Sequence, residues 1–122
     1  MADDNDDVRQ LWRACLTLSG YAVTEAINGA DAVAKALELA PDAILMDFSM
    51  PGMDGAQAVH ALKGHACTRT TPIIGVTAHI GAATVDFHRM CDTVLEKPVN
   101  PDRLLAALSW VLGRAPLPNP QT

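Results

Sequence analysis

The sequence predicts an α/β fold in which a parallel β-sheet is covered by helices on both faces. Short apolar runs alternate along the chain with longer segments whose apolar residues recur at helical spacing. The runs at residues 43–46 and 72–76 are apolar throughout, as in strands buried on both faces. Alternating strands and helices form right-handed crossovers, which place the strands parallel in one sheet.

The first elements follow from their apolar spacing and their end signals. A helix is expected over residues 6–18, where Asn5 or Asp6 can cap the start. A short strand is expected over residues 21–26, followed by a turn and a second helix over residues 31–40.

The remaining elements continue this alternation. We expect strands at residues 43–46, 72–76 and 94–97, and helices at residues 56–63, 81–90 and 101–112. Asn100 caps the last helix, Pro101 occupies its first position, and Gly113 ends it. The domain is therefore expected to span residues 1–113. Residues 114–122 contain three prolines and are expected to form a tail or the start of a linker.

Composition places the chain among small globular domains. Its 122 residues fit one domain, and 49% of them are apolar. The net charge of −5 is local, because four acidic residues lie within the first seven positions. A nucleic-acid-binding role is not expected without a basic face. No apolar run reaches the roughly 20 residues of a membrane span, and no secretory signal is visible, so we expect a cytoplasmic protein.

The three cysteines do not predict a metal or redox site. Cys15, Cys67 and Cys91 are widely spaced, and none belongs to a Cys-x-x-Cys pair. We expect buried or partly buried free thiols. Trp12 and Trp110 fall on apolar helix faces and are expected to be packing residues.

Polar residues with complementary chemistry end three of the expected strands. Asp47, Thr77 and Lys97 should meet at the carboxyl edge of the sheet, where α/β proteins bind ligands. Asp3 and Asp4 precede the first helix and would bring two more carboxylates to that edge. Clustered carboxylates repel each other unless a cation intervenes, and Mg²⁺ suits one or two carboxylates together with water and phosphate oxygens. A carboxylate there could attack phosphorus and form an acyl phosphate.

This constellation resembles the receiver domain of two-component response regulators. The resemblance covers about residues 2–113. Its matching pieces are Asp3-Asp4, the Asp-Phe-Ser-Met-Pro-Gly-Met-Asp-Gly stretch at residues 47–55, Thr77-Ala78 and Lys97-Pro98. The resemblance implies a flavodoxin-like, doubly wound parallel sheet with strand order 2-1-3-4-5.

The family also implies a role for each matching residue. Asp47 is expected to be the phosphoacceptor, Thr77 the switch hydroxyl, and Lys97 the partner first of Asp47 and then of the phosphoryl group. The expected magnesium ligands are Asp3, Asp4, Asp47 and the backbone carbonyl of Ser49. The bond before Pro98 is expected to be cis.

The resemblance implies a signalling domain rather than an enzyme, although one that assists its own phosphorylation and dephosphorylation. Its phosphodonor would be a phosphohistidine on a sensor histidine kinase or a histidine phosphotransfer protein. The output would be a conformational shift of the fourth helix, fifth strand and fifth helix. No membrane partner is expected, and the candidate assemblies are a homodimer or a swapped dimer.

The sequence departs from the family in two places. Only Met1 and Ala2 precede the acid pair, so the first strand, central in the family, is apparently truncated. Three explanations compete: a true start that lies upstream, a shortened chain that swaps or dimerises to fill the gap, or a degenerate domain. Val94 stands where the family usually has Tyr or Phe, which predicts signalling mainly through the loop at residues 77–83.

Two other functions remain open. A degenerate receiver could bind a partner without phosphorylation. A phosphohydrolase with an aspartyl nucleophile is the third reading, although such enzymes often carry a second acid two residues later, where this chain has Ser49.

Overall fold

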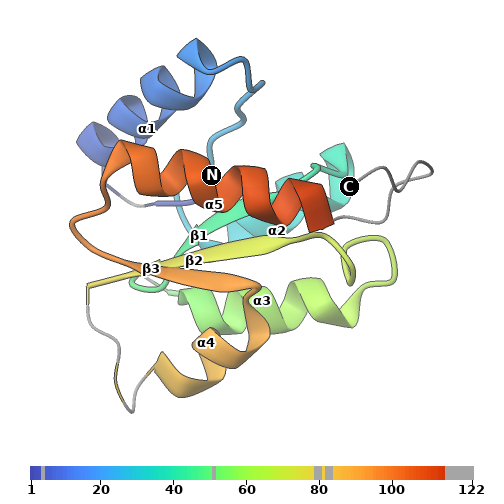
Figure 1. Ribbon diagram of the computed structural model, residues 1–122. Coiled ribbons are helices and arrows are strands. Elements are labelled where there is room, and N and C mark those ends of the chain that lie inside the picture. The colour runs from blue at the N-terminus through green and yellow to red at the C-terminus, as the bar shows by residue number, and fades with distance from the viewer. Residues whose placement is uncertain (4, 51, 79–80, 82–83, 115–122) are drawn as a thin grey trace.

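The computed structural model describes residues 1–3, 5–50, 52–78, 81 and 84–114 (Figure 1). Helices and strands alternate through most of this part of the chain. The elements are α1 (Asp6–Leu18), α2 (Gly29–Leu39), β1 (Ile44–Asp47), α3 (Gly55–Gly64), β2 (Ile73–Thr77), α4 (Val85–Met90), β3 (Thr93–Glu96) and α5 (Pro101–Arg114).

The three strands form one parallel sheet in the order β1-β2-β3. Helices α1 and α5 cover one face of this sheet, and α2, α3 and α4 lie on the other (Figure 1). The sequence prediction of an α/β fold with a parallel sheet between helices is therefore confirmed. No helix among the described residues combines the length and apolar character needed to cross a membrane.

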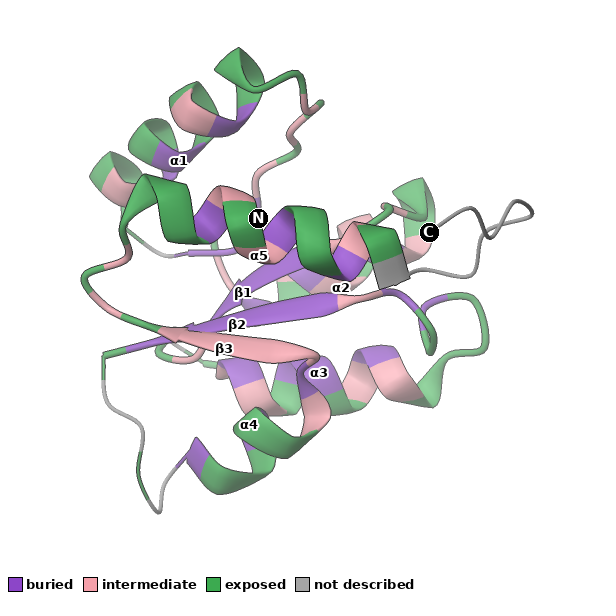
Figure 2. Ribbon diagram, in the orientation of Figure 1, coloured by how far each residue is buried: buried purple, intermediate pink, exposed green. Residues whose placement is uncertain are grey.

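Each face of the sheet has its own hydrophobic core. Leu45, Ile74 and Val76 pack with α1 and α5, whereas Ile44, Met46 and Ile73 pack with α2, α3 and α4. Every residue of β1 and β2 is buried, and Figure 2 shows both strands in purple. This two-sided burial is the reason that both strands read as continuous apolar runs in the sequence.

The strand expected over residues 21–26 is wrong. Within this segment, only Ala26 forms a bridge, and its partner is Ala2. Ala2 forms a second parallel bridge with Met46 of β1. Residues 1–3 thus lie between this segment and β1, and their hydrogen bonds reach only Thr24 and Ala26 of the segment.

Several expected element ends also need correction. Among the described residues, the fourth helix begins only at Val85 rather than at residue 81. The last helix begins at Pro101 as expected, but it continues past Gly113 to Arg114. Asn5, rather than Asp6, caps α1, because its side chain accepts hydrogen bonds from backbone N–H groups in the first turn.

Two expectations about packing are partly wrong. Trp12 is buried, but Trp110 is 52% exposed and so lies largely outside the core. Cys91 is buried and Cys15 is partly buried, as expected, whereas Cys67 is exposed. Cys67 lies in the segment between α3 and β2, where it is not held against the sheet.

Candidate functional site

Asp47 is the last residue of β1, and its side chain lies at the carboxyl edge of the sheet. The residue is only 3% exposed. Lys97 follows β3 and places its Nζ 3.2 Å from Oδ2 of Asp47 and 3.6 Å from Oδ2 of Asp3. Two buried carboxylates from distant parts of the chain therefore share one ammonium group. The Lys97–Asp47 pair is expected from the family resemblance, whereas the contact between Lys97 and Asp3 is not.

The charge balance at Asp47 is unfavourable for its ionised form. Burial, reinforced by the negative charge of Asp3, raises the pKa of Asp47 to about 6. Lys97 and the backbone N–H of Ser49 act in the opposite direction, but they do not cancel this effect. Oδ1 of Asp47 is buried and has no hydrogen-bond partner among the described residues. A buried oxygen of this kind is suited to receive a cation or to form a bond to another group.

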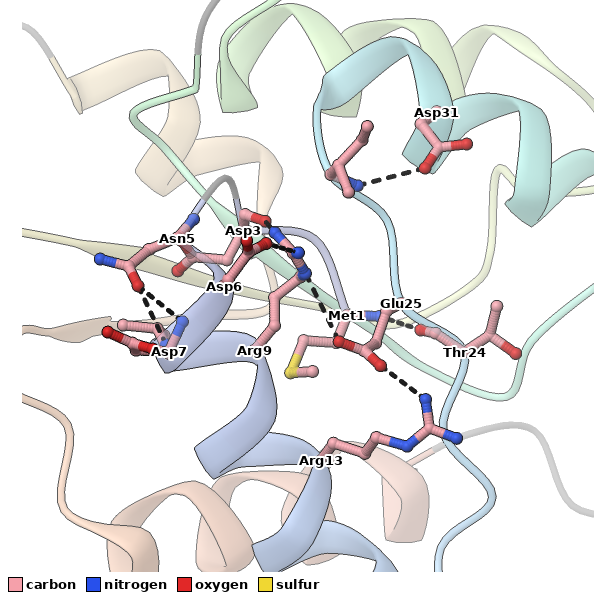
Figure 3. A network of polar contacts seen from close by, with 12 residues as sticks. Met1, Asp3, Asn5, Asp6, Asp7, Arg9, Arg13, Thr24, Glu25 and Asp31 are labelled. Carbon is pink, nitrogen blue, oxygen red and sulfur yellow. Dashed lines mark hydrogen bonds and ion pairs between the residues drawn. The ribbon is translucent and has the colours of Figure 1, made fainter.

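Hydrogen bonds to the start of α1 hold Asp3 in position. Its Oδ1 accepts from the backbone N–H of Asn5 at 2.9 Å, and its carbonyl oxygen accepts from Nη1 of Arg9 at 2.8 Å. Arg9 is buried and also pairs with Asp6 and with Glu25, so it links the segment after Ala2 to α1 and to residue 25 (Figure 3).

Arg9 is a site residue that sequence reasoning did not find. Its spacing places it on α1 beside Asp6, which is typical of an exposed ion pair. Its burial follows from the fold, because the guanidinium must reach the carbonyl group of Asp3. The sequence contained one indication that Arg9 is buried. Helical spacing places it on the same face of α1 as the buried residues Trp12 and Leu16.

Thr77 ends β2 beside Asp47 and Lys97. The backbone N–H of Lys97 donates to the carbonyl oxygen of Thr77 at 2.7 Å, and Asp47 lies in register with Val76. Thr77 is 3% exposed. The sheet therefore brings Asp47, Thr77 and Lys97 to one edge, as the expected strand ends predict, and the side chains of Asp47 and Lys97 are in contact there.

The loop after Asp47 is held tightly against the first residue of α3. The backbone N–H of Gly55 donates to the carbonyl oxygen of Phe48 at 2.7 Å, and Asp54 caps α3 in a reciprocal pair with Gln57. A Cβ atom at position 55 would come within 2.4 Å of the carbonyl oxygen of Asp47, which explains why glycine suits this position. Gly52 adopts a φ of 77°, which also favours glycine.

Other predicted site residues have mixed outcomes. Asp4 lies outside the described residues, as does most of the loop at residues 79–83. Ser49 follows Asp47 by two residues at the same edge. The peptide bond between Lys97 and Pro98 is cis, as expected.

The donor set fits a hard divalent cation. Asp3 and Asp47 supply carboxylate oxygens, and the unpaired Oδ1 of Asp47 would gain a partner. Within the described ranges, no cluster of three or more His, Cys, Asp or Glu side chains could hold a metal ion. Two carboxylates with backbone carbonyl oxygen and water are nevertheless the kind of set that Mg²⁺ accepts, because it keeps several waters.

Comparison with known proteins identifies relatives over nearly the whole chain. Residues 1–109 match the model of the response regulator receiver domain. The chain is 35% identical over 117 residues to the transcriptional regulatory protein ResD of Bacillus subtilis, with 94% of this chain and 48% of ResD covered. It thus spans about half the length of that relative. It is 31% identical to the polar-differentiation response regulator DivK of Brucella anthropi, with 94% of this chain and 95% of DivK covered.

Solved structures of similar fold agree with the match to the response regulator receiver domain. The chemotaxis protein CheY4 of Vibrio cholerae superposes with a TM-score of 0.84 at 32% identity, covering 90% of this chain and 93% of CheY4. The receiver domain of a sensor histidine kinase from Pseudomonas aeruginosa gives a TM-score of 0.81 at 30% identity, covering 92% and 93% of the two chains. That structure has a magnesium ion coordinated in its active-site cleft. This chain therefore belongs to the CheY-like receiver domains of two-component response regulators.

Proposed function

We propose that this receiver domain accepts a phosphoryl group on Asp47 in a Mg²⁺-dependent reaction. The observation that carries the proposal is the buried, unpartnered Oδ1 of Asp47, in a carboxylate whose Oδ2 shares the Lys97 ammonium with Asp3. A buried aspartate with only a structural role would be expected to have a hydrogen-bond partner for each of its two carboxylate oxygens.

The chemical step is a phosphoryl transfer. An oxygen of Asp47 attacks the phosphorus of a phosphohistidine donor, the P–O bond forms, and the P–N bond breaks with the electron pair returning to the imidazole. Lys97 already lies 3.2 Å from Asp47, so its charge is in place to pair with the phosphoryl oxygens. Thr77 supplies a hydroxyl at the end of the adjacent strand, and its role is to donate a hydrogen bond to the same group.

Asp3, Asp4, Asp47 and the backbone carbonyl of Ser49 would hold Mg²⁺. When bound, the ion supplies positive charge that offsets the repulsion between the carboxylates and the incoming phosphoryl oxygens. Arg9 contributes by fixing the carbonyl group of Asp3, and so the direction of its side chain.

The proposed domain spans residues 1–113, followed by a tail from residue 114. The proposed strand order is 2-1-3-4-5, with residues 1–3 as a truncated first strand and the segment around Ala26, which forms no ladder of its own, in the position of the second. The bridges of Ala2 to Ala26 and Met46 support this order, because they place residues 1–3 between the two neighbours that the order requires.

The phosphodonor is a sensor histidine kinase or a histidine phosphotransfer protein, and the setting is cytoplasmic. The output surface consists of α4, β3 and α5. Val94 of β3 packs against the core on the α4 side and lacks a ring that could change its orientation. Switching therefore relies on Thr77 and the loop that follows it.

Intact-mass measurement tests the proposal. The protein is incubated with acetyl phosphate and Mg²⁺, with Asp47→Ala and a matched exposed variant, Asp42→Ala, treated in parallel. We expect a single labile adduct on wild type and Asp42→Ala, none on Asp47→Ala, and none with excess EDTA. A folded wild-type protein that forms no adduct would contradict the proposal and favour a receiver that binds partners without phosphorylation. Rapid hydrolysis of added phosphoesters would instead indicate a phosphohydrolase.

A further inference from the structure

The aromatic ring of Phe87 fills a gap between α4 and the middle of the sheet. Phe87 is fully buried, and two glycines face its ring. A Cβ atom at position 75 of β2 would lie 2.6 Å from Cε2 of Phe87, and one at position 55 of α3 would lie 3.0 Å from Cε1. The ring therefore lies directly against the backbone of β2 and of the first residue of α3.

The same part of the core contains Val94. Gly75 and Val94 are register partners in β2 and β3, so their side-chain positions are neighbours on one face of the sheet. Val94 packs in the same core as Phe87. Because both strand positions carry small residues, a large ring from α4 fits beside them. The aromatic group of this region thus comes from the helix and not from β3.

A second ring connects Phe87 to the proposed phosphorylation site. The ring centroids of Phe48 and Phe87 lie 5.2 Å apart with their planes tilted by 57°, a favourable arrangement for two aromatic rings. Phe48 directly follows Asp47. Its N–H donates to the carbonyl oxygen of Val76 at 2.8 Å, and its carbonyl oxygen accepts from the N–H of Gly55 at 2.7 Å. The backbone of Phe48 is therefore fixed to both β2 and α3.

Phe87 also anchors α4 to the core. Of the six residues of α4, all of which the structure describes, Phe87 alone is buried, and Met90 is partly buried. Val85 is 43% exposed, and His88 and Arg89 are exposed as well. A helix of this length is not stable in water by itself, so its position depends on the buried ring. A displacement of the ring is therefore also a displacement of α4.

The packing around the ring leaves it little freedom to move independently. Gly75 confines it on the side of the sheet, Gly55 on the side of α3, and Phe48 on the side of the site. A close-packed interior passes a shift on to neighbouring atoms, because it has no empty space in which to absorb the shift. A displacement of the loop that begins at Phe48 would therefore reach the ring through two contacts.

We propose that Phe87 couples the state of Asp47 to the position of α4. This inference rests on the proposed phosphorylation of Asp47 and adds a route by which the modification changes the output surface. When a phosphoryl group is bound, the loop that begins at Phe48 shifts, the ring of Phe87 follows, and α4 moves with it. This route acts beside that of Thr77 and needs no aromatic residue at position 94. Coupling is reciprocal, so a change that displaces the ring also alters the affinity of the site for a phosphoryl mimic.

Hydrogen exchange at the backbone amides of α4 measures this coupling. One such amide is that of Cys91, which donates to the carbonyl oxygen of Phe87 at 3.1 Å. The protein is kept in excess acetyl phosphate and Mg²⁺ during a short labelling pulse, and intact mass gives the phosphorylated fraction. In wild type, phosphorylation is expected to change exchange in α4 by about fivefold or more. Phe87→Leu keeps an apolar side chain without the ring, so we expect an equal phosphorylated fraction but a change below about twofold.

Two further variants separate the coupling from a general loss of stability. Val111→Ala removes buried volume from the core on the opposite face of the sheet, so its α4 amides should respond as in wild type. The double variant Gly75→Ala with Phe87→Leu places a methyl group where the ring lies in wild type. It should recover part of the melting temperature lost in Phe87→Leu without recovering the response of α4. Recovery of both would show that the ring acts only through stability and would overturn the proposal.

Gly75→Ala by itself tests the same route without phosphorylation. The added methyl group would meet the ring at 2.6 Å, so the ring and α4 must move. We expect faster exchange of the α4 amides in the unmodified protein. The dissociation constant for beryllium fluoride with Mg²⁺, measured by calorimetry, is expected to change by about fivefold. Gly64→Ala is the matched control, because its Cβ would meet open space, and it should change neither quantity.

These measurements distinguish the coupling from the phosphorylation itself. If wild type forms no adduct, the proposed function is wrong and this inference is wrong with it. If wild type is phosphorylated but α4 responds equally in wild type and Phe87→Leu, phosphorylation stands and the proposed route is wrong. Unchanged exchange of the α4 amides in Gly75→Ala would also contradict the route, whatever the outcome of the phosphorylation experiment.

Discussion

Nζ of Lys97 lies 3.2 Å from Oδ2 of Asp47, although 50 positions separate the two residues in the chain. β1 and β3 do not neighbour each other, because β2 lies between them. The pair therefore forms across the carboxyl edge of the sheet and depends on the parallel arrangement of all three strands. Among the described residues, Lys97 supplies the one ammonium group that lies within ion-pair distance of both buried carboxylates, those of Asp3 and Asp47.

Lys97→Met is expected to lower the free energy of unfolding by about 1–2 kcal/mol at neutral pH in EDTA, because two buried carboxylates lose their shared cation. Added Mg²⁺ should restore part of this loss. Urea denaturation measures the effect, with Lys35→Met as the control. Lys35 pairs with Asp31 on the surface, so its replacement should change stability by about 0.5 kcal/mol or less. Equal losses of stability in the two variants would contradict the claim that Lys97 offsets the charges of two buried carboxylates.

Asp47→Asn is expected to stabilise the protein in EDTA, and increasingly so as the pH rises. The pKa of Asp47 is raised from its usual value to about 6, so the folded state keeps a proton that the unfolded state releases. The stability contributed by this group is present below about pH 4 and is lost as the pH rises through about 6. The advantage of Asp47→Asn should therefore grow across this window, to an order of 2 kcal/mol.

Urea unfolding of both proteins at several pH values tests this expectation. All other titrating groups are common to the two chains, so their difference isolates Asp47. A difference that stays constant with pH would show that burial and Asp3 do not raise this pKa.

Arg9→Met is expected to destabilise the protein by about 2 kcal/mol and to weaken Mg²⁺ binding. Arg9 is buried and donates to the carbonyl oxygen of Asp3 at 2.8 Å, so its loss leaves this buried acceptor without a partner. Arg13→Met is the matched control, because Arg13 contacts the same Glu25 at 2.5 Å from an exposed position on the same helix. Arg13→Met should change stability by about 0.5 kcal/mol or less and leave Mg²⁺ binding intact. Calorimetric titration and urea unfolding measure the two effects.

Gly55→Ala is expected to lower the free energy of unfolding by about 2 kcal/mol. The added Cβ would meet the backbone of Asp47 and Phe48 at 2.4 and 2.6 Å, and the loop that carries the site would have to move. At the other end of α3, Gly64 has open space around its Cβ position, so Gly64→Ala should be neutral or stabilising by about 0.5 kcal/mol. Thermal unfolding of the two variants provides the comparison, and similar losses in both would contradict the close packing at Gly55.

Two of the three thiols, those of Cys67 and Cys91, should react at very different rates. Cys67 is exposed and should be modified quickly by a thiol reagent. Burial raises the pKa of Cys91 to about 12, so it should react only as fast as the protein opens. Peptide mapping after timed labelling distinguishes them. Rapid modification of Cys91 in the folded protein would contradict its place in the core.

The strands that form the site could be predicted closely from the sequence, and the reason is physical. β1 and β2 are buried on both faces, so their apolar runs and the polar residues that end them are both visible in the chain. The failed strand at residues 21–26 shows the limit. Its residues have suitable propensities, but a strand also needs a paired neighbour, and residues 1–3 provide only a short one.

Residues whose role depends on distant neighbours could not be found in this way. Arg9 has the sequence context of a surface ion pair, and only the fold shows that it reaches the carbonyl group of Asp3. Trp110 shows the opposite difference. Its apolar side chain predicts packing in the core, but its position on α5 leaves it half exposed. Helix periodicity fixes one apolar face, but it does not fix how wide the covered part of that face is.

The central claim is that Asp47 itself carries the phosphoryl group, and mapping the modified residue tests this most directly. Protein treated with acetyl phosphate and Mg²⁺ is reduced with borohydride, which converts an aspartyl phosphate to homoserine, and is then digested and sequenced by mass spectrometry. We predict homoserine at position 47 and at no other aspartate. Homoserine at another position, with Asp47 unmodified, would contradict the account.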